Sequence, residues 1–367
     1  MTSTSFENTL EGTGTRDAVR VGPMEALDAE LLAHGGYAPL TGFMNRDEYR
    51  TVVDTLHLPN GAVFPLPVVL PIAENVKRNL KIGDTLSIAS EEGFLADVRV
   101  IDIFSRDRDR EAKLVYGTVS QEHPGVSVLC EQSSWCVAGP VTIRHPASQK
   151  FMEPRWPHQV KAWIRKQGFK TVTFFQTRNP THRAHEHMLK MALEITDGIV
   201  LHPLVGPTKS DDVAPAIRMD AYRALIDSYF PKDRVLLATF GAAMRYAGPR
   251  EAVFHGLVRR NYGATHFIVG RDAAGVGGFY NPDDARLLFE SLSEEIGLVP
   301  LTFDKIGYCP KCLSMASLRS CPHSDAWFSM SGTMVRELLW RGQRPPVEVM
   351  RPEIADILVG GHKNQEG

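Results

Sequence analysis

The architecture of this chain follows from one segment, Thr171-Val-Thr-Phe-Phe-Gln-Thr-Arg-Asn-Pro-Thr-His-Arg-Ala-His185. Its first five residues are β-branched or aromatic, which predicts a buried strand. Beyond it, residues 186–195 place leucine and alanine at helical spacing, which predicts a helix. The polar residues between them therefore lie on a strand-to-helix turn, where open α/β sheets bind their ligands.

The composition of this turn favours an anionic ligand. Its polar and charged side chains are Gln176, Thr177, Arg178, Asn179, His182 and His185. Asn179 suits a helix N-cap and Pro180 a first helical turn, so we expect the helix to open there. Free amides at a helix N-terminus bind anionic oxygen, and two histidines three residues apart can face one ligand. A single histidine here could equally be a satisfied core or surface residue, but the crowding favours a phosphate site.

The pattern of strands and helices changes near residue 150. Before it, short alternating strands at 64–72, 83–88 and 94–104, with helices at 24–33 and 45–55, suggest a small barrel or sandwich. After it, strands alternate with helices, which indicates βαβ units, a parallel sheet and a Rossmann-like domain. The predicted strands are 171–175, 198–204, 235–240, 265–269 and 299–304, and the predicted helices are 157–167, 186–195, 214–229, 249–262, 281–296, 331–341 and 347–359.

The composition excludes several classes of protein. The chain has 367 residues, a formal net charge of −2, 43% hydrophobic and 23% charged residues, as ordinary globular proteins do. Nothing in that charge suggests a nucleic-acid or membrane surface. The N-terminal segment lacks the features of a secretory signal, and no apolar run approaches the roughly 20 residues of a membrane helix. Cys130 and Cys136 are interpreted as reduced thiols, so we expect a cytoplasmic protein. The charge run 106–113 is interpreted as a solvated helix face.

Three further segments follow predicted strands or precede predicted helices. Gly270-Arg-Asp272 follows a strand; the glycine permits close approach of a ligand and Arg271 can grip an oxyanion, although a structural Arg–Asp pair explains it equally well. In Lys209-Ser-Asp-Asp212, the two aspartates are expected to cap the next helix or to lie near the site. Ser331-Gly-Thr333 is either a plain helix cap or a second phosphate cradle.

Four residues near the end of the chain have the composition of a zinc site. They are Cys309, Cys312, Cys321 and His323. Three thiols and one imidazole are the number and type of ligands that tetrahedral zinc requires, and no position remains for a catalytic water. The sequence therefore predicts a structural zinc site, with free thiols or a redox pair as the alternative.

Taken together, these residues resemble the ATP sulfurylase (sulfate adenylyltransferase) family over about residues 20–359. One position departs from the family pattern, because the family usually reads Gly-Arg-Asp-His-Ala-Gly where this chain has Ala273. The matching motifs are Pro39-Leu-Thr-Gly-Phe-Met44, Glu122-His-Pro-Gly125, Gln176 to His185, Lys209 to Asp212, Met244-Arg-Tyr-Ala-Gly-Pro-Arg-Glu-Ala252, Gly270 to Gly275 and the Ser331-Gly-Thr333 helix.

The resemblance implies an α/β fold in three parts. These are a PUA-like β-rich domain at 1–150, a Rossmann-like nucleotidyltransferase domain with a parallel sheet at 151–325 that includes a zinc loop at 309–323, and a small C-terminal helical segment at 326–367. It also implies roles for the site residues. The catalytic positions would be Thr177, Arg178, Asn179, His182, His185 and Arg271. Sulfate would contact Gln176, Arg178, Arg271 and Ala274. ATP would contact Gln176, Thr177, Arg178, Asn179, His182, His185, Gly270, Arg271, Asp272 and Ala273.

The implied reaction joins ATP and sulfate to give adenylyl sulfate (APS) and diphosphate. Mg²⁺ would accompany ATP, Zn²⁺ would be structural, and relatives suggest a homodimer with no nucleic-acid or membrane partner. Two alternatives stay open. One is an adenylyltransferase for another oxyanion, such as a sulfonate or phosphonate, because Ala273 leaves room for a larger group. The other is a catalytically silent nucleotide-binding relative.

Overall fold

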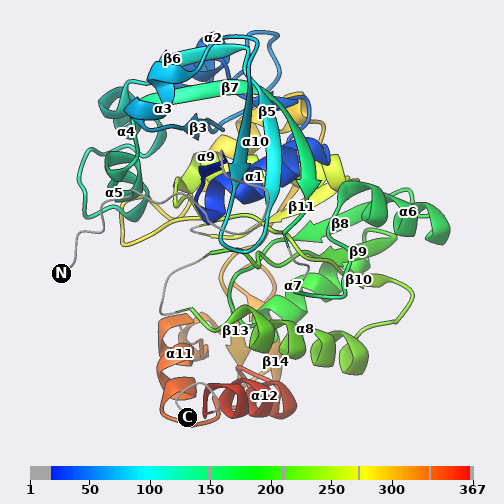
Figure 1. Ribbon diagram of the computed structural model, residues 1–367. Helices are drawn as coiled ribbons and strands as arrows, with labels where there is room; N and C mark the ends of the chain where they lie inside the picture. The colour runs from blue at the N-terminus through cyan, green and yellow to red at the C-terminus, as the bar shows by residue number, and fades with distance from the viewer. Residues whose placement is uncertain (1–17, 148–149, 208–211, 272, 330–331, 364–367) are drawn as a thin grey trace. The chain divides into compact units, whose positions relative to one another are not determined.

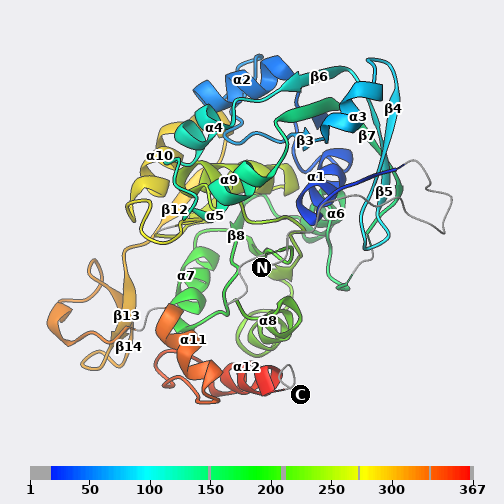
Figure 2. The same cartoon turned by 60° about the vertical axis from the view of Figure 1, so that its left-hand side comes forward.

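The computed structural model describes residues 18–147, 150–207, 212–271, 273–329 and 332–363 (Figures 1 and 2). The chain divides into two compact units, Met1–Met152 and Glu153–Gly367. Each unit has its own sheet, antiparallel pairing predominating in the first and parallel pairing in the main sheet of the second. None of the helices in these described ranges is both long and apolar enough to cross a membrane.

The first unit is built around one long strand, β7. Its described elements are β1 (Val19–Arg20), α1 (Pro23–Ala33), β2 (Gly42–Phe43), α2 (Arg46–Thr55), β3 (Leu70–Pro71), α3 (Glu74–Asn79), β4 (Thr85–Ala89), β5 (Leu95–Arg99), β6 (Asp102–Ser105), α4 (Arg108–Val115), α5 (Pro124–Glu131) and β7 (Trp135–His145). Strand β7 pairs antiparallel with β2, β3, β5 and β6, in a seven-stranded sheet. Most of the predicted strand at 64–72 is irregular, and only β3 remains of it.

The predicted strand at 94–104 forms two strands, β5 and β6, which pair with different parts of β7. Strand β5 pairs Val98 with Val141, whereas β6 pairs Asp102 with Ala138. Between these two pairings Gly139 has φ +148°, and a Cβ there would lie 1.9 Å from the carbonyl oxygen of Arg99. Only glycine fits this crossing of two backbones.

The interpretation of 106–113 as a solvated helix face is wrong for two of its charges. Arg106 and Glu111 are 5% and 3% exposed and form an ion pair of 3.8 Å. The hydroxyl of Tyr49 donates to Glu111 at 3.0 Å. A buried charge needs such partners, and the Tyr49–Glu111 bond joins α2 to α4, while the neighbouring Asp107 and Asp109 stay exposed.

The second unit is a doubly wound α/β structure. Its elements are α6 (Pro157–Gln167), β8 (Val172–Phe175), α7 (Arg183–Leu193), β9 (Gly198–Leu201), α8 (Pro215–Tyr229), β10 (Val235–Leu237), α9 (Gly248–Tyr262), β11 (His266–Val269), α10 (Asp284–Ile296), β12 (Val299–Thr302), β13 (Ile306–Cys309), β14 (Ser314–Ser317), η1 (Ser324–Ala326), α11 (Gly332–Trp340) and α12 (Pro352–Lys363). The five-stranded sheet has the order β10-β9-β8-β11-β12, and every pair in it is parallel. In Figure 2, α7 and α8 lie on one side of β8 and α9 and α10 on the other.

The strand order reverses between β8 and β11. From β8 the chain adds β9 and then β10 on one side, and α9 carries it back so that β11 pairs with the other edge of β8. Ligands of open α/β sheets bind at the carboxyl ends of the strands where such a reversal occurs. The fold therefore places a candidate site at the ends of β8 and β11.

We expect Gly139→Ala to lower the free energy of unfolding by about 3–5 kcal/mol, because the methyl group would meet a backbone carbonyl that cannot move freely. Gly61→Ala is the matched control: Gly61 also has positive φ, +83°, but a Cβ there meets nothing within 4 Å. The control should lose about 1 kcal/mol from backbone strain alone. Urea unfolding followed by circular dichroism measures both, and equal losses in the two variants would contradict the steric argument.

Candidate active site

The two loops that were predicted to bind the ligands follow neighbouring strands of the sheet. Residues 176–182 follow β8, and residues 270–275 follow β11. The two strands pair in parallel, with His266 opposite Thr173 and Phe267 opposite Phe174. Because parallel strands in register end at the same edge, both loops start side by side at the reversal of strand order.

The helix after β8 starts later than Asn179. Its first residue is Arg183 and its N-cap is His182, so the prediction that Asn179 and Pro180 open it is wrong. The main chain of Asn179 is engaged elsewhere: its N–H donates to Thr177 Oγ1 at 3.1 Å, and its carbonyl accepts from Tyr222 Oη at 2.7 Å. These bonds shape a tight polar turn before the helix begins.

The two histidines of the turn lie against each other. The rings of His182 and His185 stack with centroids 3.8 Å apart, and the His182 N–H donates to His185 Nδ1 at 3.4 Å. Burial lowers the pKa of His182 to about 4. Burial, together with His182, lowers the pKa of His185 well below its ordinary value. Both imidazoles are therefore neutral near pH 7, when each has one N–H to donate.

Arg178 is the cation of this turn. Its guanidinium lies over the ring of Tyr246, with Cζ 5.1 Å from the ring centroid. Its Nη1 is buried and has no hydrogen-bond partner within the described part of the chain. A buried N–H of a charged group without an acceptor is costly, so Nη1 is a candidate donor to an oxygen of a ligand.

The loop after β11 offers backbone more than side chains. A Cβ at Gly270 would project into open space, so nothing within 4 Å occupies the room beside it. Arg271 is exposed, and Ala273 and Ala274 are half-buried. Ala274 has φ +58°, and its carbonyl accepts the N–H of Gly248 at 3.2 Å. Asp272 lies outside the described residues.

Other predicted residues lie outside the described ranges or have different roles. Lys209, Ser210, Asp211 and Ser331 fall in the first group. Asp212 does not cap α8 as predicted, because the N-cap is Ala214. The Asp212 side chain is half-buried, and its Oδ2 has no hydrogen-bond partner in the described ranges.

Several residues that support the turn were not singled out from the sequence. Arg336 of α11 donates from Nη1 to Asn179 Oδ1 at 3.4 Å, and Tyr222 reaches the same residue from α8. Both lie on helices far from the turn in sequence, and helical spacing does not reveal which loop such a side chain meets. Tyr246 and Glu251 belong to a motif quoted for the family resemblance, which was the only signal available for them.

The four predicted zinc ligands converge on the hairpin of β13 and β14. The ligand atoms of Cys309, Cys312, Cys321 and His323 all lie within 4.8 Å of one another. Sγ of Cys312 lies 3.7 Å from Sγ of Cys321 and 3.3 Å from Nδ1 of His323. Tetrahedral zinc with bonds of about 2.3 Å to sulfur and 2.0 Å to nitrogen separates its ligand atoms by roughly 3.5–3.8 Å. The donor set therefore fits a zinc ion.

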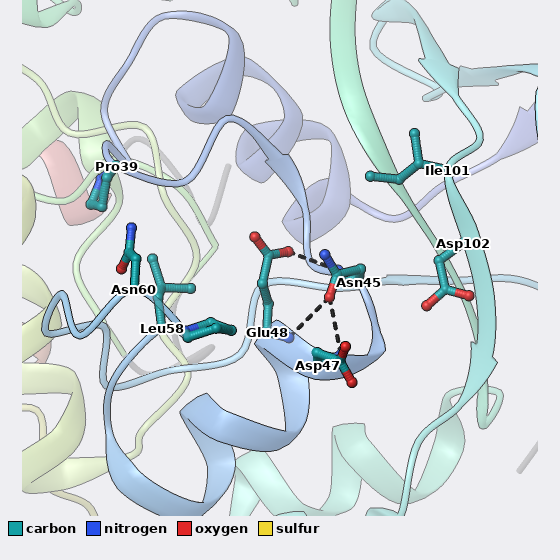
Figure 3. Close-up of a pocket in the computed structure, with 9 residues that line it drawn as sticks. Pro39, Asn45, Asp47, Glu48, Leu58, Asn60, Ile101 and Asp102 are labelled. Atoms are coloured by element: carbon teal, nitrogen blue, oxygen red, sulfur yellow. Dashed lines mark hydrogen bonds between the residues drawn. The ribbon is translucent and has the colours of Figure 1, made fainter.

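A hollow in the first unit has a cavity volume of about 530 Å³ and is lined in part by acidic groups (Figure 3). These groups already serve the start of α2. Asn45 Oδ1 accepts hydrogen bonds from the N–H groups of Asp47 and Glu48, and the Glu48 carboxylate accepts one from the N–H of Asn45. Asp102 accepts the N–H of Arg46 at 3.0 Å. The side chains of Asn45, Glu48 and Asp102 that line the hollow therefore already have hydrogen-bond partners at the start of α2.

Known proteins are similar to this chain over most of its length. A family model described as ATP-sulfurylase matches residues 154–360, and one described as a PUA-like domain matches residues 2–146. The sulfate adenylyltransferase of Synechococcus sp. JA-3-3Ab is 49% identical over 90% of this chain and 86% of its own length. That of Symbiobacterium thermophilum is 46% identical over 97% of this chain and 91% of its own.

A solved structure shows the same fold. The chain described as a hexameric APS kinase from Thiobacillus denitrificans superposes with a TM-score of 0.73 at 22% identity. The match covers 93% of this chain but spans only 62% of the length of that one. The fold class and the family predicted from the sequence are confirmed by these matches, and this chain belongs to the ATP-sulfurylase family of sulfate adenylyltransferases.

Proposed function

We propose that the site at the ends of β8 and β11 transfers the adenylyl group of ATP to sulfate. The relatives, at 42–49% identity, supply the two substrates, since they are named for this reaction. The buried Nη1 of Arg178 supports this location, because it has no hydrogen-bond partner in the described ranges and can donate to an anionic oxygen.

The chemistry asks for positioning more than for proton transfer. A sulfate oxygen attacks the α-phosphorus, a new P–O bond to sulfate forms, and the P–O bond to diphosphate breaks. Sulfate is already ionised, so no general base is needed. The protein must hold two anions in line and stabilise the charge that develops between them.

The roles of the residues follow from their places around the turn. We assign sulfate to Gln176, Arg178, Arg271 and the backbone of Ala274. We assign the triphosphate to Asn179, His182 and His185, and the remainder of the nucleotide to residues 270–273. Thr177, Arg178 and Asn179 would lie beside the reacting phosphorus. The neutral imidazoles support this assignment, because they can donate to phosphate oxygens without the cost of burying further charge.

Two metal ions complete the proposal. Mg²⁺ would accompany ATP and would neutralise part of the triphosphate charge, bound mainly by phosphate oxygens and water. Zn²⁺ is assigned to Cys309, Cys312, Cys321 and His323, where it would fasten the β13–β14 hairpin and leave no open coordination position for catalysis. The cytoplasmic location stays a prediction from the sequence, and the homodimer stays an expectation from the family resemblance.

We expect Arg178→Ala to lower kcat/KM by at least about a hundredfold, because one guanidinium both binds and stabilises the developing charge. Arg178→Lys keeps the positive charge but lacks the planar guanidinium, so its kcat/KM should lie between those of the wild type and Arg178→Ala. Diphosphate release from ATP and sulfate measures the loss, and Arg165→Ala, at an exposed position of α6, is the control. Full activity of Arg178→Ala would refute the assignment, and turnover only with a sulfonate or phosphonate would favour the alternative acceptors.

The histidine pair gives a pH signature. Burial holds the pKa of His182 at about 4 against an ordinary value of 6.5, so the unfolded chain takes up this proton first as the pH falls. The free energy of unfolding should therefore decrease as pH drops from about 6.5 towards 4. NMR titration of labelled histidine, assigned with His182→Gln, should show a midpoint near 4 that rises on adding ATP, because a nearby triphosphate favours the charged ring. A midpoint near 6.5 that ATP leaves unchanged would contradict both the burial and the ligand assignment.

We expect one zinc ion per chain in protein purified without chelators. Cys312→Ser should reduce zinc to near zero, since removing one of four ligands lowers affinity steeply, whereas Cys130→Ser should retain it. Elemental analysis by mass spectrometry measures the metal. A wild-type protein without zinc would overturn the site.

A further inference from the structure

A short loop joins the two halves of the proposed active site. It lies between β10 and α9, and its last part runs from Arg245 into Gly248, the first residue of α9. Tyr246 places its ring 5.1 Å from Cζ of Arg178, on the turn after β8. Gly248 donates its N–H to the carbonyl of Ala274, on the loop after β11. Any movement of this connecting loop would therefore reach both halves.

The connecting loop has a conformation that must be held in place. Tyr246 has φ +60°, a left-handed value that costs a residue with a side chain about 1–2 kcal/mol. Gly248 has φ +51°, and a Cβ there would lie 2.6 Å from the ring of Tyr280. Tyr280 Oη donates to the carbonyl of Tyr246 at 3.0 Å. Strain of this kind persists only where the surroundings fix the backbone.

Glu251 supplies the main fixing bonds. It lies in the first turn of α9 and is 1% exposed. Its Oε1 accepts the N–H of Arg245 at 2.9 Å, and its Oε2 accepts the N–H of Ala247 at 3.0 Å. The two bonds thus hold the residues on either side of Tyr246. A carboxylate is suited to this task because each of its oxygens can accept a separate N–H.

The surroundings of Glu251 contain further charges. Burial raises the pKa of its carboxyl, while the bond from Arg245 N–H and the charges of Arg245 and Arg178 act in the opposite direction. His255 lies with Nε2 3.6 Å from Oε1, and burial keeps that imidazole neutral by lowering its pKa well below 6.5. Arg178 therefore acts on Glu251 electrostatically, and its guanidinium lies over the ring of Tyr246.

We infer that Glu251 is a positioning residue for the adenylyl transfer: by fixing the loop around Tyr246 it holds Arg178 and Ala274 at the separation that the two substrates require. This inference rests on the proposed function, because it concerns the geometry of the same site. Glu251 is not among the residues assigned to either substrate, so its removal should change the chemical step more than the binding of ATP.

The first test compares kinetic constants of variants. In Glu251→Gln the amide NH₂ replaces one acceptor, so one backbone N–H loses its bond. We expect kcat to fall about tenfold or more, with the KM for ATP changed less than about threefold. Tyr246→Leu should show the same separation of effects, and Tyr246→Phe, which keeps the ring over Arg178, should lose less than Tyr246→Leu. An unchanged kcat in Glu251→Gln would overturn the inference.

A matched control separates positioning from stability. Leu292 is buried in the C-terminal half of α10, and Leu292→Ala should lower the thermal unfolding midpoint by core truncation. We expect its kcat to stay within about twofold of wild type. If Leu292→Ala and Glu251→Gln lose stability and kcat in the same proportion, the effect of Glu251 is structural and the inference fails.

A readout without turnover distinguishes this inference from the proposed function. If the wild-type protein forms no adenylyl sulfate, the proposed function fails, and hydrogen exchange then decides the positioning role. Peptides covering 176–182 and 244–248 should exchange faster in Glu251→Gln than in wild type, but not in Leu292→Ala. Equal exchange in all three proteins would overturn the inference.

Discussion

The parallel pairing of β8 with β11 is the contact on which the site depends. These strands are far apart in sequence, and α9 makes their pairing feasible by carrying the chain back across the sheet. Twelve residues of α9 are buried, so it is a core helix rather than a surface one. Its N-terminus holds the connecting loop through Glu251, and its C-terminal glycine, Gly263, with φ +108°, turns the chain towards β11. One helix therefore sets both the reversal of strand order and the shape of the site.

Buried arginines fix the main chain that follows the neighbouring strand, β9. Arg218 is fully buried and donates from Nε to the carbonyl of Val213 and from Nη1 to that of Leu204, on both sides of the loop after β9. Arg259 donates from Nη2 to the carbonyl of His202. Main-chain carbonyls take the place of some of the water around each guanidinium, which lowers the free-energy cost of burying its charge. The carboxyl edge of the sheet thus carries fixed positive charge, and burial and nearby arginine lower the pKa of His202 so that this ring adds none. An edge of this kind favours anionic substrates.

Sequence reasoning succeeded where a pattern is local. Strand β8 and the alternation of strands and helices were predicted because strands buried on both faces are continuous β-branched or aromatic runs. The N-cap at His182 was missed because Tyr222, from another helix, engages Asn179 and delays the helix. The break between β5 and β6 depends on the approach of Gly139 to Arg99, which no periodicity encodes. The same holds for Arg106 and Glu111, since a charge run does not say which of its members face Tyr49.

The two loops of the candidate site also differ in how far they can be predicted from local sequence. The turn after β8 was found because its chemistry is concentrated in ten consecutive residues, Gln176 to His185. The loop after β11 is held differently: its hydrogen bond to the connecting loop is between main-chain atoms, from Gly248 N–H to the Ala274 carbonyl. A side chain at position 273 takes no part in that bond. Histidine or alanine at position 273 leaves that bond possible, and under the proposed function the difference would lie in what residue 273 presents to the bound anions.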